Sequence, residues 1–154
     1  MNHAQLFAFE DDFVASLRCI PMAVRFKLDR CGVKLSLRQW SRFTRDDRQW
    51  LLEAPCATDR EAQAYRLALV GLVARRAGEA AKPLAELPSA LWAPADATPA
   101  VIAEHARDKG LRPPSDREWA SLSTLQRFVL IKLTRDNHDN VNFVPALREF
   151  GLAA

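Results

Sequence analysis

The sequence has few of the residues that bind metals or form disulfides. It contains three cysteines and three histidines in 154 residues, with no CxxC pair and no HxxxH pattern. An odd cysteine count argues against a disulfide framework, and the missing motifs leave no local metal site. We therefore expect no cofactor. The residues concerned are Cys19, Cys31, Cys56, His3, His105 and His138.

The local motifs of common enzyme classes are also missing. The chain has no nucleotide-binding glycine loop, no HExxH motif and no Ser-His-Asp arrangement that the sequence reveals. An enzymatic activity is therefore unsupported, and we expect a protein that is not an enzyme.

Long hydrophobic runs are absent as well. No run approaches the roughly 18 apolar residues that a membrane-spanning helix needs. The first stretch, MNHAQLFAFEDDF, has no basic region and turns acidic at Glu10, unlike a signal peptide. We expect a cytoplasmic protein without a membrane partner.

The composition is that of an ordinary globular protein. The chain is 49% apolar and 27% charged, and its length suits one domain with one core. Residues 79–98 carry three prolines and read as a connection between two halves that are each too short for a substantial core. We expect a single helical domain over residues 1–154.

Positive charge is concentrated in one part of the chain. The net charge is +3, yet residues 18–48 hold nine basic and three acidic residues, which gives +6 there and −3 elsewhere. This asymmetry indicates an acidic partner or a polyanion, and the alternative is a solvated helix face. The candidate partner-binding basic surface consists of Arg25, Lys27, Lys34, Arg38, Arg42 and Arg45.

Two secondary structures fit residues 20–37. Their apolar residues alternate with other residues, which is the period of a half-buried hairpin. The helical alternative spaces apolar residues by three and four, with Pro21 in the first turn and Gly32 at the left-handed end.

An internal repeat favours the helix. GVKLSLRQWSRFTRDDR, residues 32–48, aligns with GLRPPSDREWASLSTLQR, residues 110–127, after one inserted residue. The segment before Gly110 is helical by composition, and Pro113 and Pro114 exclude a strand after the glycine. By analogy both copies read as helix, glycine, loop, helix. The related segments extend over residues 20–52 and 99–134.

The repeated residues have predictable structural roles. Each copy has a serine followed three residues later by Gln or Glu, which predicts a capping box. A tryptophan predicts a core anchor, and a Thr or Ser predicts the cap of the next helix. For the final arginine we expect bonds to helix-end carbonyls, with anion binding as the alternative. The pairs are Ser36 and Ser115, Gln39 and Glu118, Trp40 and Trp119, Thr44 and Ser123, and Arg48 and Arg127.

Another helix lies between the two copies. Thr58 caps it, Glu61 completes a capping box, and Gly78 ends it. Its broad apolar face predicts a central position. Together these segments predict an all-α fold, a compact bundle of about seven to nine mostly short helices with an internal helix–Gly–helix duplication. The apolar face comprises Tyr65, Leu67, Leu69, Val70, Leu72 and Val73.

Two further segments carry polar or reactive side chains. Cys19 and Cys31 have basic neighbours that favour a thiolate, so oxidation sensing is an alternative to core packing, the interpretation we favour. The run RDNHDNVN, residues 135–142, reads as a polar turn before a short helix, with a metal or ligand site at His138 as the alternative.

Two long stretches stand out, DDFVASLRCIPMAVRFKLDRCGVKLSLRQWSRF at residues 11–43 and LQRFVLIKLTRDNHDNVNFVPALREF at residues 125–150. The first is similar to the start, and the second to the end, of the nitrate reductase-associated protein family, which consists of small bacterial proteins of unknown biochemical function. The resemblance implies an association with nitrate assimilation. It supplies no catalytic or binding residues.

Two function classes follow from these observations. The first is a non-enzymatic interaction or accessory protein, whose partner, as the resemblance implies, would be nitrate reductase or its cofactor-assembly machinery. The alternative is a nucleic-acid-binding regulator that uses the basic helix–Gly–helix segment, since this arrangement with a pI of about 9.0 is compatible with a helix-turn-helix reader.

Overall fold

A computed structural model of the chain describes residues 6–10, 16–84, 92–135 and 142–152. Contacts between residues divide the chain into two compact units, unit 1 (Met1–Glu86) and unit 2 (Leu87–Ala154). The expectation of a single domain over the whole chain is not tested by this division and stays a prediction.

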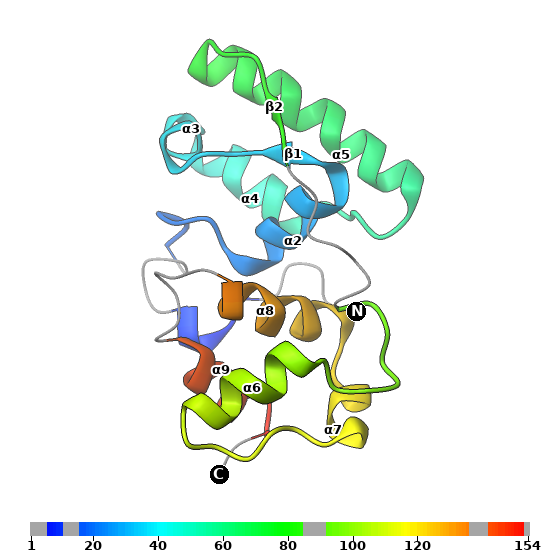
Figure 1. Cartoon of the computed structure of the whole chain (residues 1–154). Coiled ribbons are helices and arrows are strands. Elements are labelled where there is room, and N and C mark those ends of the chain that lie inside the picture. Colours follow the sequence, from blue (N-terminus) through cyan, green and yellow to red (C-terminus); the bar gives the residue numbers. More distant parts are fainter. Residues whose placement is uncertain (1–5, 11–15, 85–91, 136–141, 153–154) are drawn as a thin grey trace. The chain divides into compact units, whose positions relative to one another are not determined.

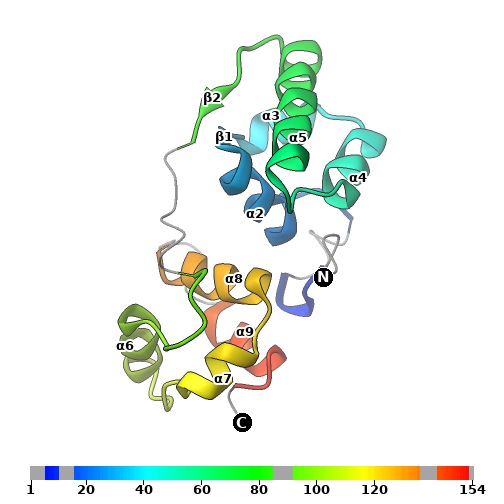
Figure 2. The ribbon, with the colours of Figure 1, turned by 90° about the vertical axis from the view of Figure 1, so that its right-hand side faces the viewer.

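Unit 1 consists of short helices around one longer helix, α5, and a two-residue strand pair (Figures 1 and 2). Its elements, in chain order, are η1 (Ala8–Glu10), α2 (Met22–Cys31), β1 (Val33–Lys34), α3 (Leu37–Arg42), α4 (Arg45–Glu53), α5 (Asp59–Leu72), η2 (Val73–Ala77) and β2 (Lys82–Pro83). The η1 element is a 3₁₀ turn and η2 is a π-helical turn. Trp40, Leu51, Tyr65 and Leu69 are buried in its core.

Unit 2 contains four helices in its described part. They are α6 (Ala100–Asp108), α7 (Asp116–Ser121), α8 (Thr124–Arg135) and α9 (Phe143–Glu149), and α8 packs against both α6 and α9. Ile102, Trp119, Phe128 and Phe143 are fully buried. The described residues of both units thus form eight α-helices, which confirms the predicted all-α class and helix count.

The stretch that fitted either a helix or a hairpin is helix α2. Gly32 ends it in the left-handed conformation, with φ +72°, and donates its N–H to the Leu28 carbonyl at 2.8 Å. The helical prediction is therefore confirmed. The sequence did not predict β1, which follows the glycine directly and pairs antiparallel with β2, so that Val33 lies opposite Pro83.

Side-chain caps start five of the helices. A serine or threonine accepts the backbone N–H three residues later, and the residue there binds back to the cap's own N–H. These pairs are Ser36–Gln39, Thr44–Asp47, Thr58–Glu61, Ser115–Glu118 and Ser123–Gln126. The sequence predicted all five caps and three of these boxes, those at Ser36, Thr58 and Ser115. Short helices need such caps because their few backbone hydrogen bonds leave most end groups unpaired.

The predicted helix from Thr58 to Gly78 is present as α5 followed by the π-helical turn η2, and Gly78 ends it with φ +66°. Its apolar face is only partly buried. Tyr65 and Leu69 lie in the core, whereas the Leu67 side chain is 67% exposed and Val70 is 36% exposed. The broad apolar face therefore extends beyond the part that the core covers.

In unit 1, a tryptophan and an arginine bind the main chain of the segment that precedes α2. Trp40 Nε1 and Arg48 Nη1 both donate to the carbonyl of Leu17, at 2.9 Å and 3.2 Å. Arg48 also donates to the carbonyls of Trp40 and Ser41 at the end of α3, so the expected binding to helix-end carbonyls is confirmed. Leu17 itself is buried with φ +63°, a strained conformation for a branched side chain.

Unit 2 contains an equivalent pair. Trp119 Nε1 donates to the Pro94 carbonyl at 3.2 Å, and Arg127 Nε donates to the Trp92 carbonyl at 2.8 Å. Arg127 Nη1 binds the Leu122 carbonyl just beyond α7. The two related segments therefore use the same residue types in the same contacts. A common origin by duplication stays a prediction.

Replacement of Arg48 tests this arrangement. We expect Arg48→Met to lower the free energy of unfolding by about 2 kcal/mol, because three carbonyls lose a charged donor. The control Arg42→Met removes an exposed arginine of neighbouring α3 and should change stability by less than about 0.5 kcal/mol. Urea unfolding followed by circular dichroism measures both, and equal losses would contradict the assignment.

Candidate functional site

The structure brings four of the six predicted basic residues to the surface around α3. Arg38 and Arg42 lie four residues apart on α3 and therefore share one side of it. Lys34 precedes the helix on β1, and Arg45 opens α4 directly after it. We call these four exposed residues the α3 basic surface: Lys34, Arg38, Arg42 and Arg45.

The cations of this surface differ in how they are engaged. Arg38 forms an ion pair with Glu79, and Arg45 Nη1 donates to the Ser16 carbonyl at 3.1 Å. Within the described ranges, the side chains of Lys34 and Arg42 form no hydrogen bond or ion pair, so their charges remain available to a partner. Arg25 lies apart from them on α2, is half-buried, and contacts the Ile20 carbonyl at 3.4 Å.

Lys27 does not belong to the surface, and its assignment there is wrong. The residue is only 2% exposed, and its ammonium donates to the carbonyls of Leu51, at 3.4 Å, and Leu52. These carbonyls lie in the last turn of α4, where a helix presents unpaired acceptors and the negative end of its dipole. Lys27 is therefore a buried cap for the end of α4.

Burial changes the chemistry around Lys27. Loss of hydration lowers the pKa of Lys27 to about 8, despite the opposing influence of Cys56 and Glu53. Burial likewise raises the pKa of the Cys56 thiol to about 11 and raises that of Cys31. Neither buried thiol is poised as a thiolate, and core packing of Cys31 is confirmed. Cys19 is half-buried and all three thiols are free.

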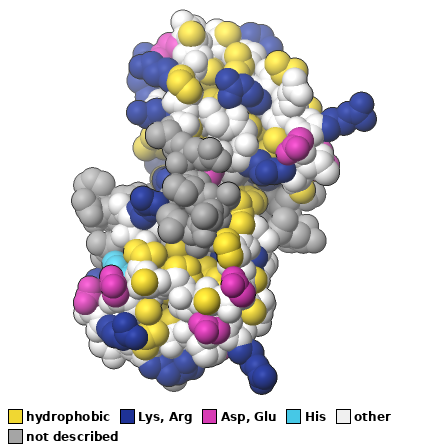
Figure 3. All heavy atoms as spheres, turned by 45° about the vertical axis from the view of Figure 1, so that its right-hand side comes forward, with side chains coloured by type: hydrophobic (Ala, Val, Ile, Leu, Met, Phe, Trp, Pro, Cys, Tyr) yellow, Lys and Arg dark blue, Asp and Glu magenta, His cyan; other side chains and the backbone are white. Residues whose placement is uncertain are grey.

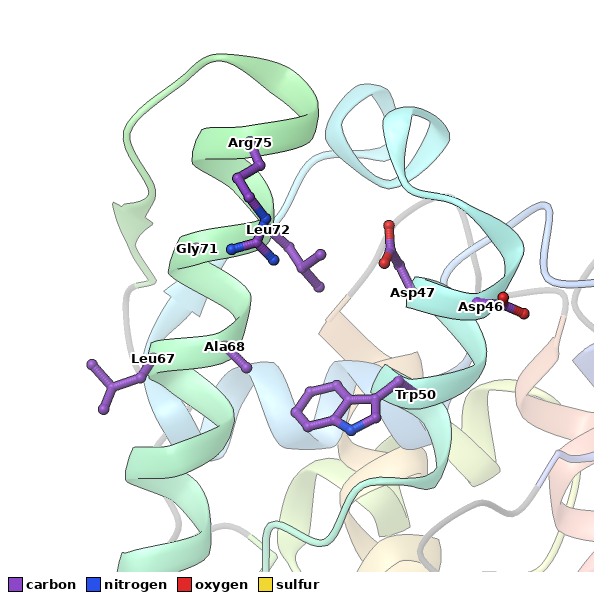
Figure 4. Close-up of a pocket in the computed structure, with 8 residues that line it drawn as sticks. All are labelled: Asp46, Asp47, Trp50, Leu67, Ala68, Gly71, Leu72 and Arg75. Carbon is purple, nitrogen blue, oxygen red and sulfur yellow. The ribbon is translucent and has the colours of Figure 1, made fainter.

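A second candidate surface lies between α4 and α5, where sequence reasoning placed none. A pocket of about 380 Å³ lies between the two helices. Figure 4 shows the Trp50 ring directed from α4 toward Ala68 of α5. Leu67, Gly71 and Leu72 complete its apolar side. Trp50 is 45% exposed and stacks on buried Tyr65, with ring centroids 5.8 Å apart. We call this pocket the α4–α5 groove.

One end of the α4–α5 groove is charged. Asp47 points toward the gap between the helices, and Arg75 lies over Gly71 (Figure 4). Partial burial favours a raised pKa for Asp47, but hydrogen bonds from Arg76 and Thr44 outweigh it and lower the pKa. Asp47 is thus an engaged carboxylate, bound to Arg76 Nε at 2.9 Å. Arg75 has no hydrogen bond or ion pair to any residue that the structure describes.

Only weak sequence signals pointed to the groove. Gly71 interrupts a helical pattern without ending it, and Leu67 and Val70 widen the apolar face beyond what one helix contact buries. The other proposed site, the polar run at residues 135–142 with His138, lies outside the described residues except for its two end positions.

Among the residues that the structure describes, no group of three or more His, Cys, Asp or Glu side chains is arranged to hold a metal ion. In the same parts of the chain, no helix is both long and apolar enough to span a bilayer.

Comparison with known proteins gives one match. The pattern of a family described as conserved nitrate reductase-associated protein matches residues 6–150, nearly the whole chain. No curated protein and no solved structure matches.

The buried ammonium of Lys27 predicts a specific pH dependence. Its pKa is about 8 in the folded protein and 10.5 in an unfolded chain, so between these values the unfolded state binds more protons. Stability contributed by Lys27 therefore rises as pH increases from about 8 to 10.5, and it is lost as pH falls through 8.

The measurement compares wild type with Lys27→Met at pH 7 and pH 10 by urea unfolding. The unfolding free energy of wild type, relative to that of Lys27→Met, should be higher at pH 10 than at pH 7 by on the order of 2 kcal/mol. The buried thiols and Tyr65 titrate in both proteins, so their effects largely cancel in the difference. A difference that stays constant between the two pH values would refute the buried ammonium.

Proposed function

The chain belongs to the family of conserved nitrate reductase-associated proteins, and from this we propose that it is a non-enzymatic accessory protein of nitrate assimilation. In this proposal the chain acts by binding a protein partner, either nitrate reductase or a component of its cofactor-assembly machinery. The binding surface that we propose is the α3 basic surface of unit 1.

The observation that carries this proposal is the contrast between engaged and unengaged cations. Arg30, Arg48, Arg66 and Arg127 all donate to main-chain carbonyls and so stabilise the fold. Lys34 and Arg42 are exposed and have no partner in the described structure, so folding alone does not account for them. Exposed, unengaged cations favour an acidic partner surface.

The charge balance of the two units supports the same proposal. Unit 1 holds fourteen Lys and Arg residues against eleven Asp and Glu, and unit 2 holds eight against eight. The visible face of unit 1 in Figure 3 displays more Lys and Arg than acidic side chains. In the related segment of unit 2, Ser121 and Thr124 stand where unit 1 has Arg42 and Arg45. The proposed surface is thus specific to unit 1.

The test mixes the purified full chain with purified nitrate reductase from the same organism, and separately with its cofactor-insertion protein. The double variant Arg42→Glu/Arg45→Glu should weaken binding by at least about tenfold, since charge reversal turns attraction into repulsion. Its stability should remain within about 1 kcal/mol of wild type, because both side chains are exposed. Isothermal titration calorimetry gives the affinities.

The matched control is Arg117→Glu, an exposed arginine on α7 that corresponds in the repeat to Arg38. It should change the affinity by less than about twofold. The proposal fails if neither protein binds the wild-type chain, or if control and double variant weaken binding equally. Tight binding to random duplex DNA with a steep salt dependence would instead favour the nucleic-acid alternative.

A further inference from the structure

The α4–α5 groove leaves large parts of two apolar side chains exposed, although Trp50 also stacks on Tyr65. Leu67 is 67% exposed and Trp50 is 45% exposed, although both could contribute more to stability if buried. Single exposed apolar residues are common, but these two line the same pocket from two different helices. Grouped exposure of this kind is typical of an interaction surface.

Gly71 lies on the floor of this groove, inside α5. A glycine in a helix interior costs about 1 kcal/mol relative to alanine. A Cβ atom at position 71 would meet only the flexible Arg75 side chain, with Nη1 at 3.1 Å and no core atom within 4 Å. The core therefore does not require this glycine. The space above the helix backbone at Gly71 is occupied instead by the guanidinium of Arg75.

The next turn of the chain is also unusual. Val73–Ala77 forms a π-helical turn, a rare geometry that is found frequently at functional sites. This turn carries Arg75, which lines the groove without a partner in the described structure. The other charges of the lining are less available, because Asp47 binds Arg76 and Asp46 points away from α5 (Figure 4).

The shape of the groove favours a segment of a macromolecule over a small molecule. Small ligands are generally enclosed, with most of their surface buried. Half of the residues that line this pocket are themselves exposed, namely Asp46, Trp50, Leu67 and Arg75. A side chain that projects from a partner's backbone can be buried there by the partner itself, which closes the open side.

We propose that the α4–α5 groove binds an acidic amphipathic segment of a partner protein. An aromatic or long aliphatic side chain of that segment packs on Trp50 and Ala68, and a carboxylate about one helical turn away pairs with Arg75, whose guanidinium lies over Gly71. This geometry follows the helix-in-groove mode of peptide recognition. The inference rests on the proposed function only in taking the occupant to be a protein.

The experiment selects phage-displayed random 12-residue peptides on the immobilised full chain. Enriched peptides are then synthesised with a fluorophore and titrated by fluorescence anisotropy. We expect them to share an apolar residue with Asp or Glu three or four positions away. Gly71→Leu, which fills the floor of the groove, should weaken their binding at least about tenfold. Gly71→Ala serves as a milder second variant should Gly71→Leu unfold the chain.

Two controls distinguish the groove from the rest of unit 1. Gln63→Leu adds the same side chain to an exposed position of α5 outside the groove, and it should leave binding unchanged. Arg75→Glu should weaken binding of the acidic peptides at least about tenfold, and replacement of the peptide carboxylate by lysine should restore it.

The inference is overturned if no peptide is enriched, if enriched peptides lack acidic residues, or if Gly71→Leu and Gln63→Leu behave alike. A concentration-dependent dimer that Gly71→Leu abolishes would show that a second copy of the chain occupies the groove, and it would also overturn the inference. Failure of the peptide selection alongside binding to nitrate reductase would leave the proposed function intact. Enriched acidic peptides without binding to nitrate reductase would support the groove inference and contradict the proposed function.

Discussion

Each unit depends on a tryptophan and an arginine, eight residues apart, that bind the main chain of an irregular segment ahead of the unit's first α-helix. In unit 1 both side chains donate to one carbonyl, that of Leu17, and in unit 2 they donate to the carbonyls of Pro94 and Trp92. A buried carbonyl without a donor is costly, so these bonds fix where an irregular segment crosses the core. The short helices of each unit gain their stability from packing around this fixed point, since helices of six to nine residues are marginal alone.

The need to pair main-chain carbonyls also divides the cations of unit 1 into two groups, those that bind such carbonyls and those that remain unengaged. Arg48, Arg66 and the buried Lys27 end helices by donating to their last carbonyls, and Arg30 binds the loop between α4 and α5. Among the described residues of unit 1, the exposed cations whose side chains form no hydrogen bond or ion pair are Lys34 and Arg42 around α3, Arg75 beside the α4–α5 groove, Arg60 on α5 and Lys82 on β2. The proposed function and the groove inference both start from this remainder. A cation count from the sequence, by contrast, mixes the two groups and overstates the binding surface.

Local sequence signals predicted most helix boundaries, because caps and left-handed glycines act within a few residues. The cap at Ser36 and the ends at Gly32 and Gly78 all follow from neighbouring residues. Burial of Lys27 could not be predicted in this way, since it depends on the end of α4 arriving beside α2. The pairing of β1 with β2 also joins segments about fifty residues apart. The exposure of Leu67 was missed because a helical pattern shows which residues share a face, but not whether a neighbour covers it.

Hydrogen exchange of the four indole N–H groups, followed by NMR of the ¹⁵N-labelled full chain, tests the central claim most directly. That claim is that Trp40 and Trp119 anchor the two units through buried hydrogen bonds, whereas Trp50 stands on an open groove. The account predicts that the indole protons of Trp40 and Trp119 exchange only when their units unfold, while that of Trp50 exchanges rapidly. Exchange of Trp40 and Trp119 at the rate of Trp50 would contradict it.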